Sequence, residues 1–152
     1  MKLTTKGRFA VVALLDIAIN RNSDNNPVTL SHISERQNIS LSYLEQLFVK
    51  LRKHKIVTSY KGPGGGYTLT QSPNDLNVAQ IIKAVDDNMD ARVCHGLQNC
   101  NKNKKCLTHD LWNDLTNHVY KYLSNVTLGS LINKSQSLNT VQPLAQFIKQ
   151  QG

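Results

Sequence analysis

Apolar residues in the first third of the chain recur every three or four positions, a spacing that predicts amphipathic helices. The first helix is expected over residues 8–20 with a cap near residues 4–5, and the second after a cap at Thr29, ending near Gln37. A third helix is expected over residues 41–54. Its apolar positions form one stripe on one face, made up of Leu41, Leu44, Leu47, Phe48 and Leu51.

Only a short turn, Asn38-Ile39-Ser40, separates the second helix from the third, as in a helix-turn-helix. On the face opposite the stripe, four side chains follow one another at intervals of three, four and three residues, so they project together. In a recognition helix, polar and aromatic groups near the N-terminus meet base edges, and cations further along meet phosphates. A solvated helix face would explain any one of these residues, but explains the set less well. The four residues are Tyr43, Gln46, Lys50 and Lys53.

Two stretches rich in strand-forming residues, 56–60 and 67–70, flank a glycine-rich turn and predict a β-hairpin. After a helix-turn-helix, such a hairpin is a wing, and we expect its tip, with Lys61 and Gly64, to enter the minor groove of DNA. A phosphate-cradling loop is the rival interpretation. It is disfavoured because no Lys-Ser or Lys-Thr pair follows and the next element is a strand.

The second half of the chain predicts a helix over residues 77–86, an irregular segment over 90–106 and a long helix from Leu107. Asn77 and Gln80 have the spacing of a capping box. The long helix carries a nearly heptad stripe, which we expect to be a dimerisation surface; packing against the first helix is the alternative. Thr127 is expected to cap a last short helix. The stripe consists of Leu111, Trp112, Leu115, Val119, Tyr122 and Val126.

The predicted fold class is therefore mainly α with a small β-hairpin wing, a winged helix-turn-helix followed by a long dimerisation helix. Four regions are expected along the chain. They are a DNA-binding domain over residues 1–90, a cluster-binding loop over 91–106, dimerisation helices over 107–133 and a flexible tail over 134–152.

Charge is distributed unevenly and favours a polyanion as partner. Residues 1–70 hold ten Lys and Arg against four acids, a net of +6, whereas residues 71–152 hold eight against six, a net of +2. No apolar run approaches the roughly 20 residues that span a bilayer, and no signal peptide is visible, so we expect a cytoplasmic protein without a membrane partner. No catalytic arrangement is present, and an enzyme is not expected.

All three cysteines lie between Cys94 and Cys106, in the pattern Cys94-x5-Cys100-x5-Cys106-x2-His109. An odd number excludes a closed disulfide framework, and clustered thiols in a cytoplasmic chain point to metal or redox chemistry. Thiolates with an imidazole suit zinc or an iron–sulfur cluster. The five-residue gaps lack the tight knuckle of structural zinc sites and favour a cluster, with zinc left open. His95, beside Cys94, is a competing ligand.

Several of these stretches resemble the IscR family of iron–sulfur cluster-sensing winged-helix transcription regulators. The matching segments cover residues 3–8, 33–37 (ISERQ), 39–48 (ISLSYLEQLF), 62–67 (GPGGGY), 106–109 (CLTH) and 125–129 (NVTLG). The resemblance covers about residues 1–133.

The resemblance implies a 2Fe-2S cluster held by Cys94, Cys100, Cys106 and His109, and a homodimer on double-stranded DNA. It further implies repression of cluster-assembly genes by the cluster-bound form, with the cluster-assembly machinery as cluster donor, and altered target choice in the cluster-free form. By the same resemblance Ser42, Tyr43 and Gln46 contact DNA, and Glu45 discriminates between site classes. Lys61 departs from the arginine of the best-known member, and lysine lacks the planar fork of arginine.

Two other functions remain open from the residues themselves. One is a zinc-stabilised DNA-binding regulator without cluster sensing. The other is a 2Fe-2S electron-transfer protein, which would need neither the basic residues between Lys50 and Lys61 nor the glycine-tipped hairpin.

Overall fold

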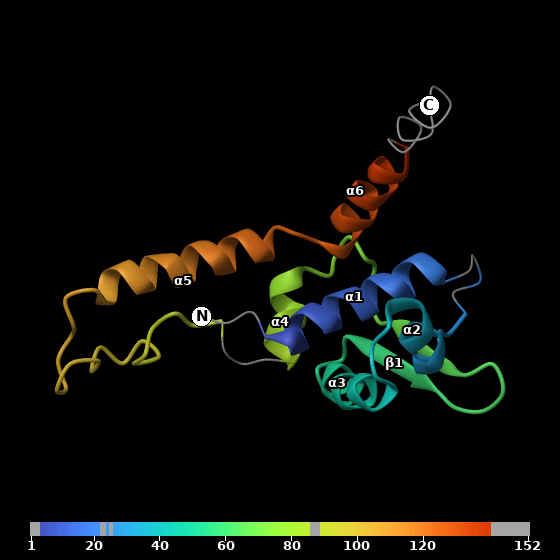
Figure 1. Ribbon diagram of the computed structural model, residues 1–152, viewed down its shortest axis with the longest axis horizontal. Coiled ribbons are helices and arrows are strands. Elements are labelled where there is room, and N and C mark those ends of the chain that lie inside the picture. Colours follow the sequence, from blue (N-terminus) through green and yellow to red (C-terminus); the bar gives the residue numbers. More distant parts are fainter. Residues whose placement is uncertain (1–3, 22–23, 25, 86–88, 141–152) are drawn as a thin grey trace, which may run out of the picture.

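Within residues 4–21, 24, 26–85 and 89–140, which are the residues that the computed structural model describes, the chain forms six helices and one antiparallel hairpin (Figure 1). This arrangement confirms the predicted fold class of a mainly α protein with a small β-hairpin. The elements are α1 (Thr5–Asn20), α2 (Leu30–Gln37), α3 (Leu41–Lys53), β1 (Val57–Tyr60), β2 (Gly66–Leu69), α4 (Val78–Val85), α5 (His109–Ser124) and α6 (Leu128–Thr140).

The core lies between α1, α3 and α4, with α2 and the hairpin closing its sides. The apolar stripe of α3 is buried from Leu44 to Leu51, as its spacing predicts. Leu41 is the exception, because its side chain is 40% exposed. At 3.6 residues per turn this residue falls at the edge of the stripe, in the first turn of the helix. The prediction that Leu41 is buried was therefore wrong.

Side chains at the helix ends explain where the helices start and stop. The Thr29 hydroxyl accepts from the backbone N–H of His32 at 3.2 Å, and Asn38 ends α2 in the left-handed conformation with φ 54°. Asn77 and Gln80 cap α4 reciprocally, at 3.0 and 2.9 Å. These predicted caps are confirmed, whereas the predicted end of this helix at Asp86 lies outside the described residues.

A buried carboxylate joins α1 to α2. Asp16 accepts two hydrogen bonds from the Arg36 guanidinium, at 3.0 and 2.6 Å, and one from the Gln37 amide at 2.7 Å. The Asp16 side chain is fully buried, while that of Arg36 is 37% exposed. Because α2 is the first helix of the helix-turn-helix, this cluster sets its position on the core.

Replacing Arg36 with alanine is expected to lower the free energy of unfolding by about 3 kcal/mol, because the Asp16 carboxylate would stay buried with Gln37 as its remaining side-chain donor. Chemical denaturation of the purified protein measures this loss. Arg21→Ala, at the exposed end of α1, is the control and should change the free energy by less than about 0.5 kcal/mol. Equal losses in the two variants would contradict the structural role of the Asp16 cluster.

The hairpin is built around glycines that no other residue could replace without strain. Val57 pairs with Leu69 and Tyr60 with Gly66, and Val28 adds a short bridge to Tyr67. Gly66 has φ +142°, and a side chain there would come within 2.5 Å of the Val28 carbonyl oxygen. Gly64, at the tip, has φ +74° with open space around it. At its glycines the hairpin tip can therefore bring its backbone close to another surface.

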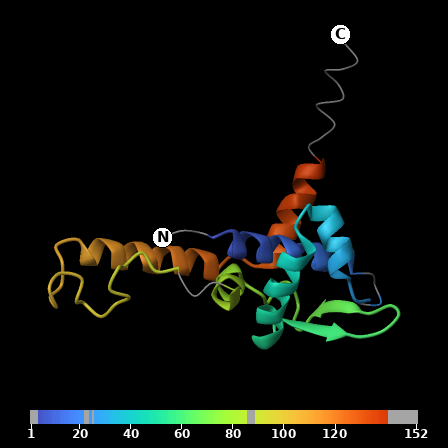
Figure 2. The same cartoon turned by 60° about the horizontal axis from the view of Figure 1, so that its bottom comes forward.

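α5 projects from the body of the molecule, and the segment that precedes it runs back alongside it (Figures 1 and 2). It packs on α4, and its apolar stripe is left open, with Leu111 58% and Tyr122 65% exposed. The alternative in which α1 covers this stripe was therefore wrong. None of the described helices has the length and apolar character that crossing a membrane requires.

The last helix runs further than its sequence suggested. Thr127 caps α6, accepting from the backbone N–H of Ser130 at 3.1 Å, as predicted. The helix then continues to Thr140 instead of ending near residue 132, because Leu131 and Ile132 are followed by seven polar residues and one leucine without glycine or proline. Residues 134–140 of the expected flexible tail are thus helical, and residues 141–152 lie outside the described part of the chain.

Candidate metal centre and nucleic-acid interface

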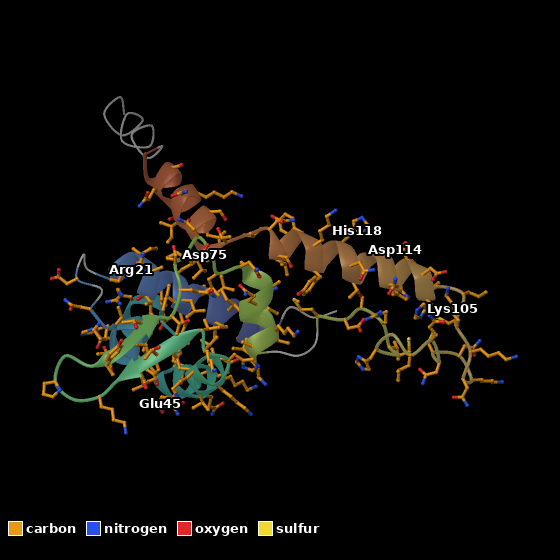
Figure 3. The ribbon with its side chains drawn as sticks, turned by 180° about the vertical axis from the view of Figure 1, so that it is seen from behind. Arg21, Glu45, Asp75, Lys105, Asp114 and His118 are labelled. Carbon is orange, nitrogen blue, oxygen red and sulfur yellow. The ribbon has the colours of Figure 1, made fainter. Side chains whose placement is uncertain are left out.

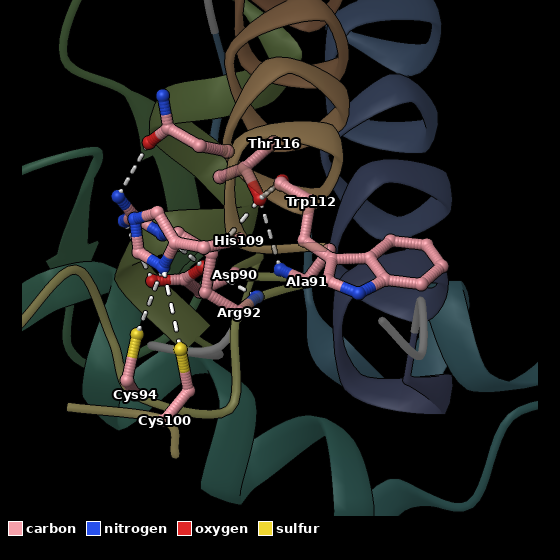
Figure 4. Close-up of polar contacts among 9 residues, drawn as sticks. Asp90, Ala91, Arg92, Cys94, Cys100, His109, Trp112 and Thr116 are labelled. Atoms are coloured by element: carbon pink, nitrogen blue, oxygen red, sulfur yellow. Dashed lines mark hydrogen bonds and ion pairs between the residues drawn. The ribbon is translucent and has the colours of Figure 1, made fainter. Parts of the chain in front are cut away.

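Three of the four predicted ligands meet at the start of α5. His109 is the first residue of that helix, and its Nδ1 lies 3.4 Å from Sγ of Cys94 and 3.6 Å from Sγ of Cys100 (Figure 4). The three ligand atoms lie within 4.8 Å of one another. Cys94 and His109 are buried and Cys100 is half-buried. The long loop thus brings together side chains that are fifteen residues apart in the sequence.

Cys106 lies beside this group without completing it at the same short range. Its backbone N–H points at Sγ of Cys100, at 3.2 Å, and its side chain lines the same cavity of about 180 Å³ as the other three ligands. The sequence placed Cys106 in the first turn of the helix, but the helix begins three residues later, after Thr108. That expectation was wrong because Thr108, with φ −106° and ψ 8°, is the non-helical N-cap and His109 is the first helical residue.

His95, the competing ligand, is placed away from the cavity. Its backbone has φ 51°, its side chain is exposed, and it belongs neither to the group of ligand atoms nor to the residues that line the cavity in the described structure.

An ion pair that the sequence analysis did not identify anchors the loop to α5. Arg92 binds both carboxylate oxygens of Asp90, each at 2.7 Å, and donates to Asn113 of α5 at 2.9 Å (Figure 4). The backbone N–H of Ala91 donates to the Thr116 hydroxyl, also on α5, at 3.0 Å. Hydrogen bonding from Arg92 lowers the pKa of Asp90 to about 2. The Asp-x-Arg sequence just before Cys94 was the available signal for this anchor.

The surroundings of the thiols favour thiolate at two of the three positions. Burial opposes ionisation of Cys94, but the backbone amides of Gly96, Gln98 and Asn99 outweigh it, so the pKa of Cys94 is lowered. The Cys100 thiol lowers the pKa of Cys106 by hydrogen bonding to it, and the pKa of Cys100 is raised in turn. Thiolate is the form that binds metal.

The donor set and its setting fit a soft metal centre. Three thiols and one imidazole are the ligands of structural zinc sites and of iron–sulfur clusters with mixed ligation. The separations of 3.4 and 3.6 Å around His109 suit one tetrahedral ion, while the more distant Cys106 and the cavity leave room for a larger centre. Trp112 also lines the cavity, with Nε1 donating to the Thr108 hydroxyl at 3.1 Å.

The predicted DNA-contacting residues belong to α3 and to the hairpin, and these two elements lie on the same side of the molecule (Figure 2). Glu45 projects outward from α3 on this side (Figure 3). The exposed members of the set are Ser42, Glu45, Gln46, Lys50, Lys53, Lys61 and Gly64. Tyr43 differs, because its ring packs edge-to-face on Phe9 of α1 at 5.6 Å and is half-buried.

Lys50 has a partner within the chain that the helix-face pattern did not reveal. Its ammonium donates to the carbonyl of Val85, the last residue of α4, with 3.2 Å between Nζ and O. It was expected to point toward a DNA phosphate like Lys53. The spacing of residues along α3 gives the direction of the Lys50 side chain but not that the end of α4 packs beside it.

Comparison with known protein families identifies one match over most of the chain. Residues 3–134 match the Rrf2 family, described as an iron-dependent transcriptional regulator. Among curated relatives, the HTH-type transcriptional regulator IscR of Pectobacterium atrosepticum is 50% identical over 139 residues, covering 91% of this chain and 84% of that protein. The protein of the same name from Escherichia coli O1:K1 is 51% identical, covering 91% and 85%.

Solved structures show the same fold. The structure titled T. potens IscR is 29% identical with a TM-score of 0.76, covering 96% of each chain. The structure of CymR, titled the global cysteine regulator of B. subtilis, is 27% identical with a TM-score of 0.74, covering 88% of this chain and 98% of that one. Both likenesses extend beyond the helix-turn-helix to most of the chain.

Proposed function

The chain belongs to the Rrf2 family of iron-dependent transcriptional regulators, and on this premise we propose that it senses an iron–sulfur cluster. Like its relatives, it is a winged-helix transcription regulator and not an enzyme. The observation that carries the proposal is the convergence of Cys94, Cys100 and His109 at the start of α5. The electron-carrier alternative loses its support, because relatives about half identical over 91% of this chain are HTH-type regulators.

The cluster of the proposal is 2Fe-2S, with Cys94, Cys100, Cys106 and His109 as ligands. Two irons with two protein ligands each require four donors, and the four line one cavity. The cluster would supply a labile centre whose presence or loss reports the iron and redox state of the cell. The chain's own residues hold the ligands in place, since the Asp90–Arg92 pair fixes the loop and Thr116 binds it to α5.

DNA recognition is assigned to α3 and the hairpin. Ser42, Tyr43 and Gln46 would read base edges, Lys53 and Lys61 would meet the phosphates and the minor groove, and Gly64 would let the hairpin tip approach. Glu45, exposed on the same side, would reject some bases and so separate two classes of site. The cluster-bound form represses cluster-assembly genes under this proposal, and the cluster-free form keeps other targets.

The proposed functional unit is a homodimer that forms through α5 in the cytoplasm and receives its cluster from the cluster-assembly machinery. The open apolar stripe supports the dimer, since side chains such as Leu111 and Tyr122 are more than half exposed in one chain. A two-fold dimer also presents two recognition helices to two half-sites.

Trp112 is the only tryptophan of the chain and lines the ligand cavity, so it reports what the cavity holds. We expect protein purified without oxygen to contain iron and acid-labile sulfide and to absorb visible light. Its tryptophan fluorescence should be quenched, because an absorbing cluster accepts energy from the nearby indole, and should recover when a chelator removes the iron. Fluorescence and metal analysis of the same sample provide the measurement.

Zinc is the outcome that would replace this proposal. Colourless protein that holds one zinc per chain, shows unquenched Trp112 and takes up no iron and sulfide on reconstitution would make the chain a zinc-stabilised DNA-binding regulator.

A further inference from the structure

The contact between α3 and α4 contains a polar bond that recognition of DNA does not require. Lys50 on α3 donates to the carbonyl of Val85, with 3.2 Å between Nζ and O. Val85 is the last residue of α4 in the described part of the chain, and carbonyls in the last turn of a helix lie at the negative end of its dipole. A lysine ammonium forms a charge-assisted hydrogen bond there. The bond ties the recognition helix to the last turn of α4.

Lys50 lies on the same face of α3 as the residues assigned to base recognition. It follows Gln46 by four positions and Tyr43 by seven, so the three form one row along the helix. A helix moves as a rigid unit over two turns. A change in where Lys50 meets α4 therefore changes how Tyr43 and Gln46 are presented to DNA.

α4 is connected to the ligand-bearing part of the chain at both of its ends. At its start, the backbone N–H of Val78 donates to the Val126 carbonyl at 2.9 Å, two residues beyond the end of α5, whose first residue is His109. At its other end, Val85 precedes Cys94 by nine residues in the sequence. In Figure 1, α4 stands between α5 and the remaining helices of the DNA-binding body.

Apolar packing holds α4 on α1, where Ile82 leaves so little room that a side chain at Gly7 would come within 3.3 Å of it. Within the described residues, the Lys50–Val85 bond is the one side-chain hydrogen bond between α3 and α4. It is thus the specific polar link through which a displacement of α4 would reach α3.

We propose that Lys50 is a positioning residue that transmits the state of the Cys94, Cys100, Cys106 and His109 site to the recognition helix, through its hydrogen bond to the end of α4. This inference rests on the proposed function. It removes Lys50 from the set of simple phosphate contacts and makes it the link between ligand site and DNA-reading surface.

The test compares DNA affinity with and without the cluster in matched variants. The probe is a DNA duplex enriched from a random-sequence library by the cluster-loaded wild-type protein, and fluorescence anisotropy at fixed salt gives both dissociation constants. Their quotient, cluster-free over cluster-loaded, is the coupling ratio. Lys50→Met keeps the length of the side chain but loses the donor. We expect it to reduce the ratio by about two- to thirtyfold, as far as the wild-type ratio allows.

Two further lysine variants distinguish a loss of coupling from a loss of positive charge. Lys53→Met removes an equal charge three residues further along α3, where the described structure gives that side chain no hydrogen bond or ion pair. It should raise both dissociation constants by the same factor and leave the ratio unchanged. Lys50→Arg retains a cationic donor and should retain most of the ratio.

The inference would be overturned if Lys50→Met weakened DNA binding equally with and without the cluster, so that the coupling ratio did not change. It would also be overturned if Lys50→Arg did not retain the ratio. The proposed function fails separately. If the wild-type protein takes up no iron and sulfide, cluster sensing itself is wrong. If the wild-type protein loads a cluster and its coupling ratio differs from one, an unaltered ratio in Lys50→Met contradicts only the role proposed for Lys50.

Discussion

Replacing His109 with alanine is expected to lower the affinity for the cluster by more than about a hundredfold. Residues that only orient a metal ligand already contribute ten- to a hundredfold, and His109 supplies a ligand atom itself. Its Nδ1 lies 3.4 Å from Sγ of Cys94 and 3.6 Å from Sγ of Cys100, so its loss removes the ligand atom that joins the two thiols. Iron and sulfide analysis with visible absorption after anaerobic purification measures the effect. The cluster-free variant should still bind the sites that the cluster-free wild type binds.

His95 provides the matched control, because it is also a histidine, lies next to Cys94 and is exposed. His95→Ala should keep iron, sulfide and spectrum. His109→Cys should keep a cluster with an altered spectrum, because a thiolate donates more charge to iron than an imidazole does. Loss of the cluster in His95→Ala together with its retention in His109→Ala would show that the ligand assignment is wrong.

Local signals gave most of the fold in advance. The caps at Thr29 and Asn77 and the glycine-rich turn of the hairpin each depend on residues within six positions of one another, and such short-range chemistry can be read directly from a sequence. The length of α6 was missed because weak periodicity after Ile132 resembles that of a loop, and a helix there needs no strong apolar stripe. Leu41 was misplaced because spacing gives the direction of a side chain but not where the core ends.

The ligand residues could be found because their types and spacing already limit the chemistry. What could not be found are the long-range contacts that position the ligand loop and the recognition helix. Arg92 reaches Asn113 across twenty-one positions, and Lys50 reaches Val85 across thirty-five. In both pairs the partners belong to different elements, so no helical or strand period relates them, and they become neighbours only when the elements pack together. The same holds for Tyr43, whose contact with Phe9 makes part of its ring structural.

That contact changes how the recognition helix should be tested. Removing the Tyr43 ring would weaken packing as well as DNA contact, so Tyr43→Phe, which keeps the ring on Phe9, is the better variant for the hydroxyl. Gln46 is exposed and can be shortened without loss of core packing. It is therefore the side chain whose removal reports most directly on base recognition.

Gln46→Ala is expected to weaken binding to the selected duplex by about five- to 150-fold, which corresponds to the loss of one bidentate base contact of about 1–3 kcal/mol. Binding to a scrambled duplex and the dependence of affinity on salt should hardly change, because no phosphate contact is lost. Lys53→Ala should behave in the opposite way, weakening both duplexes alike and reducing the salt slope by about one. The contrast follows from their places on α3, with Gln46 in its first half and Lys53 as its last residue. Titrations at several salt concentrations measure both effects, and equal losses on both duplexes for Gln46→Ala would show that α3 does not read bases through this residue.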